Sequence, residues 1–248
     1  MPVRVVCWDW NGTLLDDVAR CLRVMNRMLA DFGRPQIVDA AAYRALFRFP
    51  LDRFYADVGI GPGEYRAAVD RYLELLEADR SVVPLHAGAR ETIAGLRARG
   101  VSQVLASATQ APLLEAQLRP HEIAHGFDAV LSITDPHTAS KRDVIVGWLR
   151  ATGYDAADVL LIGDTDHDHE IARELGTRFV HFERGHQALD RDVDVVRIGS
   201  LPELEAIVSS DARTSLHLGT GVPPRHVGNG DGTDASDRIR RRRCRSRD

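Results

Sequence analysis

One lysine lies between two acidic segments of the chain. Lys141 is the only lysine among 32 lysines and arginines, with Asp9 before it and the acidic run 163–168 after it. An ammonium on a flexible side chain supplies a point charge, whereas a guanidinium offers a planar fork. A lone ammonium with two groups of carboxylates suggests a site for a phosphate and Mg²⁺. A solvated lysine in an arginine-rich chain is the alternative for Lys141 alone.

The elements that must position these residues alternate between strand and helix. The predicted strands lie at 3–8, 102–106, 128–132, 158–162, 178–182 and 194–198. The predicted helices between them lie at 88–99, 111–119, 141–152 and 168–175. This alternation indicates an α/β fold, a Rossmann-like parallel sheet with helices on both faces. Because ligands bind at the carboxyl ends of such strands, we expect Asp9, Ser107 and Asp164 to meet at one edge.

A helical insertion interrupts the pattern. Amphipathic helices are predicted at 17–33, 39–48, 51–58 and 63–79. We therefore expect residues 1–14 and 84–208 to form a catalytic core and residues 15–83 to form an α-helical cap. Residues 209–248 contain many small polar residues and arginines and few large apolar ones. They are predicted to be a disordered basic tail.

Composition excludes several classes of protein. At 248 residues, with 44% hydrophobic and 27% charged residues, the chain resembles a globular protein. It contains no apolar run of the ~20 residues that span a bilayer and no signal-peptide pattern, so a cytoplasmic protein without membrane contact is expected. The three cysteines lack the spacing of a zinc site or a disulfide framework. The arginine-rich segment 238–245 lacks aromatic residues, so nucleic acid is not an expected partner. The oligomeric state stays open.

Four motifs occur in an order that resembles the haloacid dehalogenase superfamily. Its first motif resembles Asp9-Trp10-Asn11-Gly12-Thr13-Leu14, its second Ser107, its third Lys141 and its fourth the segment 163–168. The resemblance covers residues 3 to about 200 and is closest to phosphatases with a helical cap after the first motif. The layout looks most like the phosphoglycolate phosphatases. It therefore implies a phosphatase with a small phosphorylated substrate.

The resemblance also implies roles for the motif residues. Asp9 would be the nucleophile that forms an aspartyl-phosphate, which splits one difficult hydrolysis into two steps. Lys141 would neutralise charge on the phosphoryl group, and Ser107 would donate a hydrogen bond to it. Asn11 and Gly12 would border the bound phosphate. For Ser107 alone, capping of the next helix is the simpler interpretation.

Magnesium is the implied cofactor. Asp9, the backbone carbonyl of Asn11 and the side chain of Asp164 would bind Mg²⁺. Asp168 would hold a metal-bound water or orient Lys141, although an acid that interacts with a helix dipole is an equal alternative. In the cap, Arg48, with Arg44 and Arg53, is a candidate to bind a second anionic group of the substrate. A solvated surface position is the alternative for each of these arginines.

Asn11 departs from the family pattern. Most phosphatases of this superfamily carry an aspartate there, which protonates the leaving alcohol and then activates water. An amide does neither, and the loss of acid–base help is worth ~10²–10⁴-fold in rate. Three interpretations follow: a slower phosphatase, a phosphatase restricted to good leaving groups, or a phosphate-binding pseudoenzyme. Cleavage of carbon–phosphorus bonds is disfavoured because 15–83 contains no lysine, and dehalogenation because it does not require the metal-binding aspartates.

Overall fold

A parallel sheet forms the centre of the protein. The computed structural model describes residues 2–79, 81–134 and 140–217. In these residues the sheet has six strands in the order β3-β2-β1-β4-β5-β6, all paired in parallel. Their bounds are β1 Val5–Trp8, β2 Ser102–Gln110, β3 Ala129–Ile133, β4 Val159–Gly163, β5 Arg178–Phe182 and β6 Val196–Ile198. The predicted fold class is confirmed.

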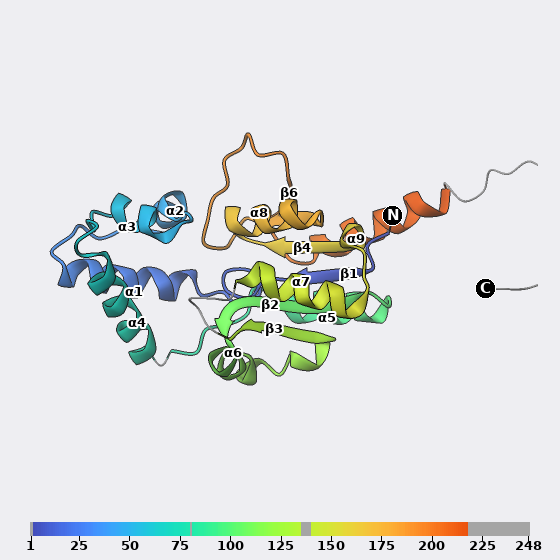
Figure 1. Cartoon of the computed structure of the whole chain (residues 1–248), viewed down its shortest axis with the longest axis horizontal. Coiled ribbons are helices and arrows are strands. Elements are labelled where there is room, and N and C mark those ends of the chain that lie inside the picture. The colour runs from blue at the N-terminus through green and yellow to red at the C-terminus, as the bar shows by residue number, and fades with distance from the viewer. Residues whose placement is uncertain (1, 80, 135–139, 218–248) are drawn as a thin grey trace, which may run out of the picture.

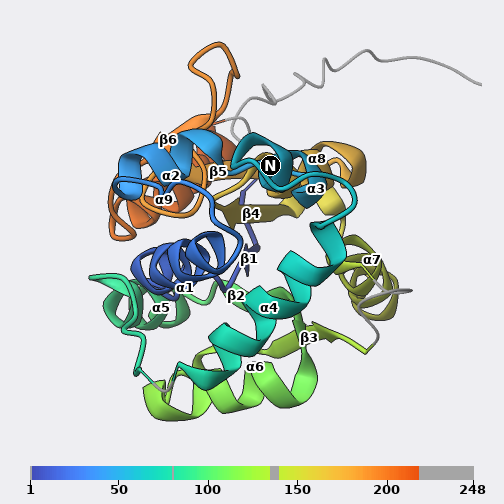
Figure 2. The same cartoon turned by 90° about the vertical axis from the view of Figure 1, so that its left-hand side faces the viewer.

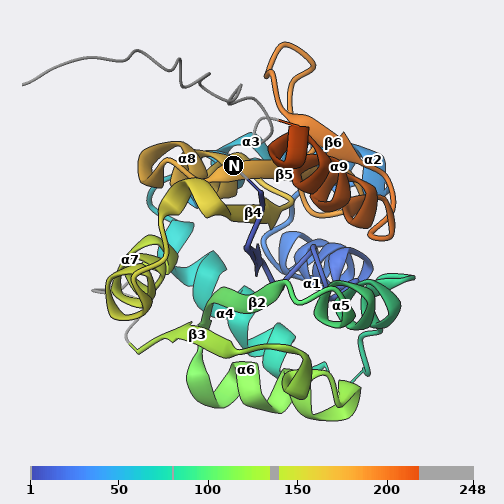
Figure 3. The ribbon, with the colours of Figure 1, turned by 90° about the vertical axis from the view of Figure 1, so that its right-hand side faces the viewer.

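Successive side chains of β1 point to opposite faces of the sheet, because a strand has a period of two, and they are buried on both faces. Val6 and Trp8 belong to an apolar cluster with residues of α5 (Ala89–Ala98), α6 (Ala111–Leu118) and α9 (Glu203–His217). Val5 and Cys7 belong to a second cluster with α7 (Lys141–Thr152) and α8 (Asp166–Leu175). Figure 3 shows α7 and α8 on one side of the sheet and α5 and α9 on the other.

The insertion forms its own apolar cluster. Its helices are α1 Val18–Asp31, α2 Ala40–Leu46, α3 Leu51–Asp57 and α4 Tyr65–Ala78. Met28, Leu29, Phe54 and Ile60 are buried within the cluster that these helices share. The four helices lie beyond the end of the sheet at which β1 finishes (Figures 1 and 2). We propose that residues 15–83 are a cap over the core, and this separate cluster supports the division.

The prediction of a disordered tail from residue 209 is wrong for its first part. Helix α9 runs from Glu203 to His217 and was not predicted from the sequence. Leu204 and Val208, four residues apart, pack into the same apolar cluster as α5. Both residues lie within the predicted core, and the polar residues that follow them give no sequence sign that the helix continues past residue 208. The rest of the predicted tail, including the arginine-rich segment 238–245, lies outside the described residues.

Strand β2 is longer than predicted. The expected strand stopped before Ser107, but β2 continues to Gln110, so Ser107 lies inside the strand. The pairing with β3 shifts its register between Ser107 and Gln110. Small side chains at 106–108 weaken the strand pattern in the sequence, whereas pairing with β3 keeps the backbone extended.

None of the described helices has the length and apolar character of a membrane span.

Candidate active site

Four charged residues meet at the carboxyl edge of the sheet. Asp9 follows β1, Asp164 follows β4, Lys141 is the first residue of α7, and Asp168 lies in the first turn of α8. All four are buried, and Lys141 is only 4% exposed. The Lys141 Nζ donates to Asp9 Oδ1 at 2.5 Å and to Asp168 Oδ1 at 2.6 Å. The structure thus brings together four residues that are separated by as many as 159 positions, from 9 to 168.

Helix caps aim Lys141 and Asp168 at each other. Ser140 is the N-cap of α7 and accepts a hydrogen bond from the Asp143 N–H, which fixes Lys141 at the first helical position. Asp168 Oδ2 accepts from the Thr165 backbone N–H at 3.2 Å and the Thr165 hydroxyl at 2.7 Å, in a capping box at the start of α8. Its Oδ1 remains for Lys141. Asp168 therefore serves both as a helix-terminal acid and as the residue that orients Lys141.

The charges of the site do not balance. Burial alone would lower the pKa of Lys141, but Asp168 and Asp9 hold it above its usual value. Burial raises the pKa of Asp9 and Asp164, and repulsion from neighbouring carboxylates adds to both shifts. Three buried carboxylates therefore share one ammonium. An added cation would lower the pKa of Asp9 and Asp164.

The donor atoms of this site fit Mg²⁺. Carboxylate oxygens of Asp9, Asp164 and Asp168 lie within 4.8 Å of one another. Mg²⁺ prefers oxygen ligands and is commonly held by one or two carboxylates plus substrate oxygens. Asp164 is held in place by the Thr13 hydroxyl, which donates to Oδ1 at 3.1 Å, and by the His186 N–H, which donates to Oδ2 at 2.5 Å. The residues present thus suit the cofactor expected from the sequence.

Gly12 allows the chain to turn beside Asp164. Its φ is +79°, and a Cβ at this position would lie 2.2 Å from Asp164 Oδ2. Its backbone N–H donates to Asp17 Oδ1 at 2.8 Å and to the Leu15 carbonyl at 3.0 Å. That Gly12 borders the bound phosphate stays a prediction, and its N–H is already used within the protein. Its contribution is the turn itself.

A pair of glycine substitutions tests this requirement. Gly12→Ala should lower the free energy of unfolding by more than about 1 kcal/mol, because the new methyl group meets Asp164 and the positive φ is strained. Gly147→Ala should raise it by about 0.5–1 kcal/mol, because Gly147 lies inside α7 with no atom within 4 Å of its Cβ position. Urea denaturation measures both. Equal effects of the same sign would contradict the proposed role of Gly12.

Asn11 is held by a network that sequence reasoning missed. Its Nδ2 donates to Asp17 Oδ2 at 2.9 Å, and its Oδ1 accepts from the Thr109 hydroxyl at 3.0 Å. Asp17 occupies the N-cap position of α1 but makes no side-chain cap hydrogen bond. Its carboxylate instead binds Asn11, Gly12 and the His186 ring Nε2, the last at 2.9 Å.

His186 supplies a buried positive charge beside this network. Burial alone would lower its pKa, but the carboxylate of Asp17 raises it to about 9, so the imidazole is charged near neutral pH. Its Nδ1 lies 3.1 Å from the Tyr43 hydroxyl of α2, which links the core loop to the cap. An aspartate at position 11 would place a second carboxylate next to Asp17. The surroundings of position 11 are therefore built for an amide.

The other predicted residues fall in different places. Ser107 is buried at the edge of the site, where its hydroxyl accepts from the Thr109 N–H at 3.0 Å. Arg48 does not reach the site: its Nε forms an ion pair with Asp57 Oδ2 at 3.1 Å on the cap. Arg44 donates to the carbonyls of Arg184 and Gly185 and so holds the loop that carries His186. The expectation that Arg48 binds the substrate is therefore corrected for this conformation.

A cavity of about 370 Å³ lies between these core residues and the cap. The core side of its lining consists of Asp9, Asn11, Ser107, Lys141, Asp164 and Asp168. Its walls come from α1, α2, α3 and α4 of the insertion and from α6 of the core. A ligand bound at Asp9 and Lys141 would therefore extend toward the cap.

The residues 6–182 match the family model of haloacid dehalogenase-like hydrolases. The chain belongs to this family. Its relatives include phosphoglycolate phosphatase 1 of Pseudomonas aeruginosa, 26% identical over 184 residues that cover 71% of this chain and 67% of the relative. The phosphoglycolate phosphatase of Synechococcus elongatus is 25% identical over 174 residues, which cover 70% of this chain and 81% of the relative.

Solved structures agree on the fold. A predicted phosphatase from Clostridium acetobutylicum superposes with a TM-score of 0.71 at 19% identity, covering 85% of this chain and 100% of its own. A haloacid dehalogenase-like hydrolase from Streptococcus pneumoniae has a TM-score of 0.69 at 20% identity, with 83% and 98% covered. The resemblance inferred from the four motifs is confirmed, as is the expected class of enzyme, a phosphatase-type hydrolase of the haloacid dehalogenase family.

Proposed function

We propose that this protein is a Mg²⁺-dependent phosphatase that hydrolyses a small phosphate ester through an aspartyl-phosphate on Asp9. The contact of Lys141 with both Asp9 and Asp168, beside Asp164, is the observation that carries the proposal. A pseudoenzyme that only bound phosphate would not need this complete set. The buried, oriented arrangement therefore favours a working enzyme.

In the proposed mechanism, the Asp9 carboxylate attacks the phosphorus of the substrate and the ester oxygen leaves. Lys141 neutralises charge on Asp9 and the phosphoryl group as they approach, and Asp168 keeps its ammonium in place. Mg²⁺, held by Asp9, Asp164 and the Asn11 carbonyl, would supply further positive charge to the phosphoryl oxygens. Water then hydrolyses the acyl phosphate and restores Asp9. Asn11 takes no part in proton transfer.

Two sources suggest different substrates. The names of the bacterial relatives favour phosphoglycolate, a small phosphorylated carboxylic acid, as the sequence also suggested. At 25–26% identity, these relatives support phosphate hydrolysis as the reaction more strongly than they support phosphoglycolate as the substrate. The walls of the cavity, on the other hand, favour an apolar leaving group. The chemistry at Asp9 is the same for either substrate.

Metal removal tests the proposed cofactor. Release of phosphate from acetyl phosphate or p-nitrophenyl phosphate should require Mg²⁺ and stop when EDTA is added. Mg²⁺ should also raise the Tm of the wild type, because a ligand that binds only the folded state stabilises it. Asp164→Asn should lose that stabilisation, whereas Asp190→Asn, at an exposed position, should keep it. Phosphate release that continues unchanged in EDTA would contradict the proposal.

A further inference from the structure

The cavity above Asp9 has an apolar wall. Phe47, Phe49 and Leu51 from the α2–α3 region, Leu73 from α4 and Leu113 from α6 line it. Leu73 and Leu113 are each 54% exposed, and Leu51 is also exposed. Large exposed aliphatic side chains that gather around one cavity mark a site for an apolar group. A leaving group that extended from Asp9 into this cavity would contact these side chains.

Arg20, Arg44 and Arg48 contact groups of the protein itself. Arg20 is the one arginine among the described residues that line the cavity. Its Nη2 donates to the carbonyls of Leu76 and Asp79, whereas its Nε is buried without a hydrogen-bond partner and lies 3.8 Å from Asp79 Oδ2. Arg44 and Arg48 bind the 184–185 carbonyls and Asp57. Arg20 is therefore held by the backbone through one nitrogen of its guanidinium, and Arg44 and Arg48 do not line the cavity.

Asn11 sets a second condition on the leaving group. Its amide cannot donate a proton to a departing oxygen, and both of its polar ends are held by Asp17 and Thr109. The absence of this acid therefore favours a leaving oxygen that departs as an anion. A phenol, with a pKa of about 10 like a tyrosine side chain, gives a far more stable anion than an alkyl alcohol does. An aryl ester meets both conditions, since it is apolar and leaves without acid catalysis.

We propose that the substrates of this site are aryl phosphates, the phosphate monoesters of phenols. The inference rests on the proposed phosphatase activity. The Asp9 carboxylate forms a bond to phosphorus while the bond between phosphorus and the phenolic oxygen breaks, and the electron pair leaves on the phenolate. The phenolate takes a proton from water. A second water then attacks phosphorus, releases dihydrogen phosphate with both of its protons, and restores the Asp9 carboxylate.

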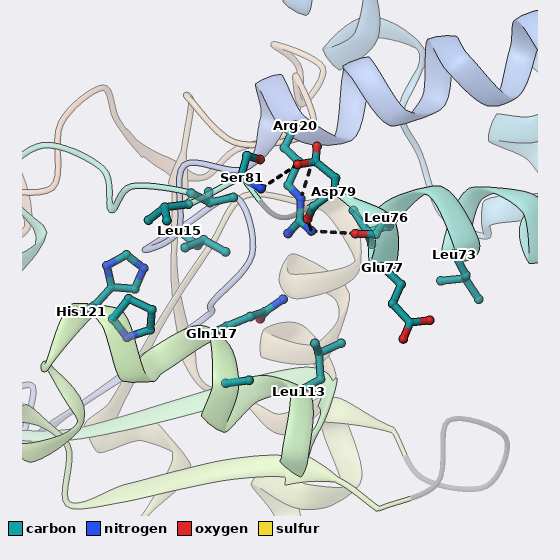
Figure 4. A pocket seen from close by; sticks show the side chains of 14 residues that line it. Leu15, Arg20, Leu73, Leu76, Glu77, Asp79, Ser81, Leu113, Gln117 and His121 are labelled. Atoms are coloured by element: carbon teal, nitrogen blue, oxygen red, sulfur yellow. Dashed lines mark hydrogen bonds and ion pairs between the residues drawn. The ribbon is translucent and has the colours of Figure 1, made fainter.

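The cavity leaves space for substituents on the ring. It shares Leu73, Leu76, Leu113 and Gln117 with an adjoining cavity of about 620 Å³. Figure 4 shows Leu113 rising from α6 and Leu73 projecting from α4 at this second cavity. Asp79 and Ser81 add polar groups to its lining. A phenol with an extended substituent would therefore place its ring against the apolar wall and its substituent in this second cavity.

Four substrates test separately whether the site requires an apolar ring and whether it requires a good leaving group. Phenyl and benzyl phosphate carry the same ring, but only phenyl phosphate has a good leaving group; acetyl phosphate has a good leaving group without a ring. Phosphoglycolate represents the carboxylic acids. We expect kcat/KM for phenyl phosphate to exceed that for benzyl phosphate at least ~100-fold, the lower range for acid catalysis. The kcat/KM for phenyl phosphate should also exceed the kcat/KM for acetyl phosphate and for phosphoglycolate, mainly because the KM for phenyl phosphate is lower.

A pair of variants tests the apolar wall. Leu113→Gln should raise the KM for phenyl phosphate about tenfold, because the ring loses part of the apolar surface against which it is buried. Val38→Gln replaces a valine that is 86% exposed and does not line either cavity, so it should leave the KM unchanged. Equal KM values for the Leu113→Gln variant and the wild type would overturn the assignment of the ring to this wall.

The remaining outcomes are also distinct. Phosphoglycolate as the best substrate would overturn the aryl class and leave the phosphatase proposal intact. Benzyl phosphate turned over as fast as phenyl phosphate would show that another group supplies the proton, and would overturn the inference as well. A lack of phosphate release from all four probes, acetyl phosphate included, would contradict the phosphatase proposal itself.

Discussion

Asp9→Asn should lose at least about 10⁴-fold in phosphate release, because the amide cannot form the aspartyl-phosphate. The fold should survive, since the amide has nearly the same size as the carboxylate and Asp168 still pairs with the Lys141 ammonium. The measurement is initial-rate phosphate release with acetyl phosphate at saturating Mg²⁺, alongside the Tm of the variant.

Asp190→Asn is the matched control for this substitution, because it makes the same chemical change at an exposed position. It should retain wild-type turnover. If the Asp9→Asn variant remained folded and kept more than about a tenth of the wild-type rate, Asp9 would not be the nucleophile, and direct attack by water would be the better account.

Lys141→Met should reduce turnover by about 10²–10³-fold, the range for loss of one group that stabilises charge in the transition state. It should also destabilise the protein by about 3–5 kcal/mol at neutral pH, because Asp9 and Asp168 lose the ammonium that lies between them. Without the ammonium, burial should raise the pKa values of Asp9 and Asp168 above those of the unfolded chain. Their cost is therefore greatest at neutral pH and decreases as the pH falls and they bind protons.

Arg142→Met provides the control at the next position. The Arg142 side chain is 45% exposed and pairs with Glu174 on the surface, so its loss should cost less than about 1 kcal/mol. Urea denaturation of both variants at pH 7 and pH 5 measures the difference. A Lys141→Met protein as stable as the wild type at both pH values would contradict the buried ion pairs.

The sequence predicted the core of the site because two simple rules applied to it. Periodic apolar residues located the strands, and the carboxyl ends of parallel strands share one edge, so Asp9 and Asp164 were expected to meet. The place of Lys141 at the start of α7 followed from the same alternation. In these positions local pattern and tertiary structure agree.

The parts that the sequence did not predict depend on long-range contacts. His186 lies in a loop without a periodic pattern, and it meets Asp17 across 169 positions of the chain. Arg48 appeared free for a substrate, but its pairing with Asp57 depends on how α2 and α3 pack in the cap. In the sequence, His186 and Arg48 are single charged residues near turns. A single residue has no periodic pattern from which its contacts could be predicted. The network around Asn11 was hidden for the same reason.

The most direct test of the account is to trap the phosphorylated enzyme. The wild type would be denatured rapidly during turnover of acetyl phosphate with Mg²⁺, treated with borohydride, digested and analysed by mass spectrometry. Borohydride reduces an aspartyl-phosphate to homoserine, so the account predicts homoserine at position 9, only when substrate was present. Phosphate release with an unmodified Asp9, or with the reduced product at another aspartate, would contradict it.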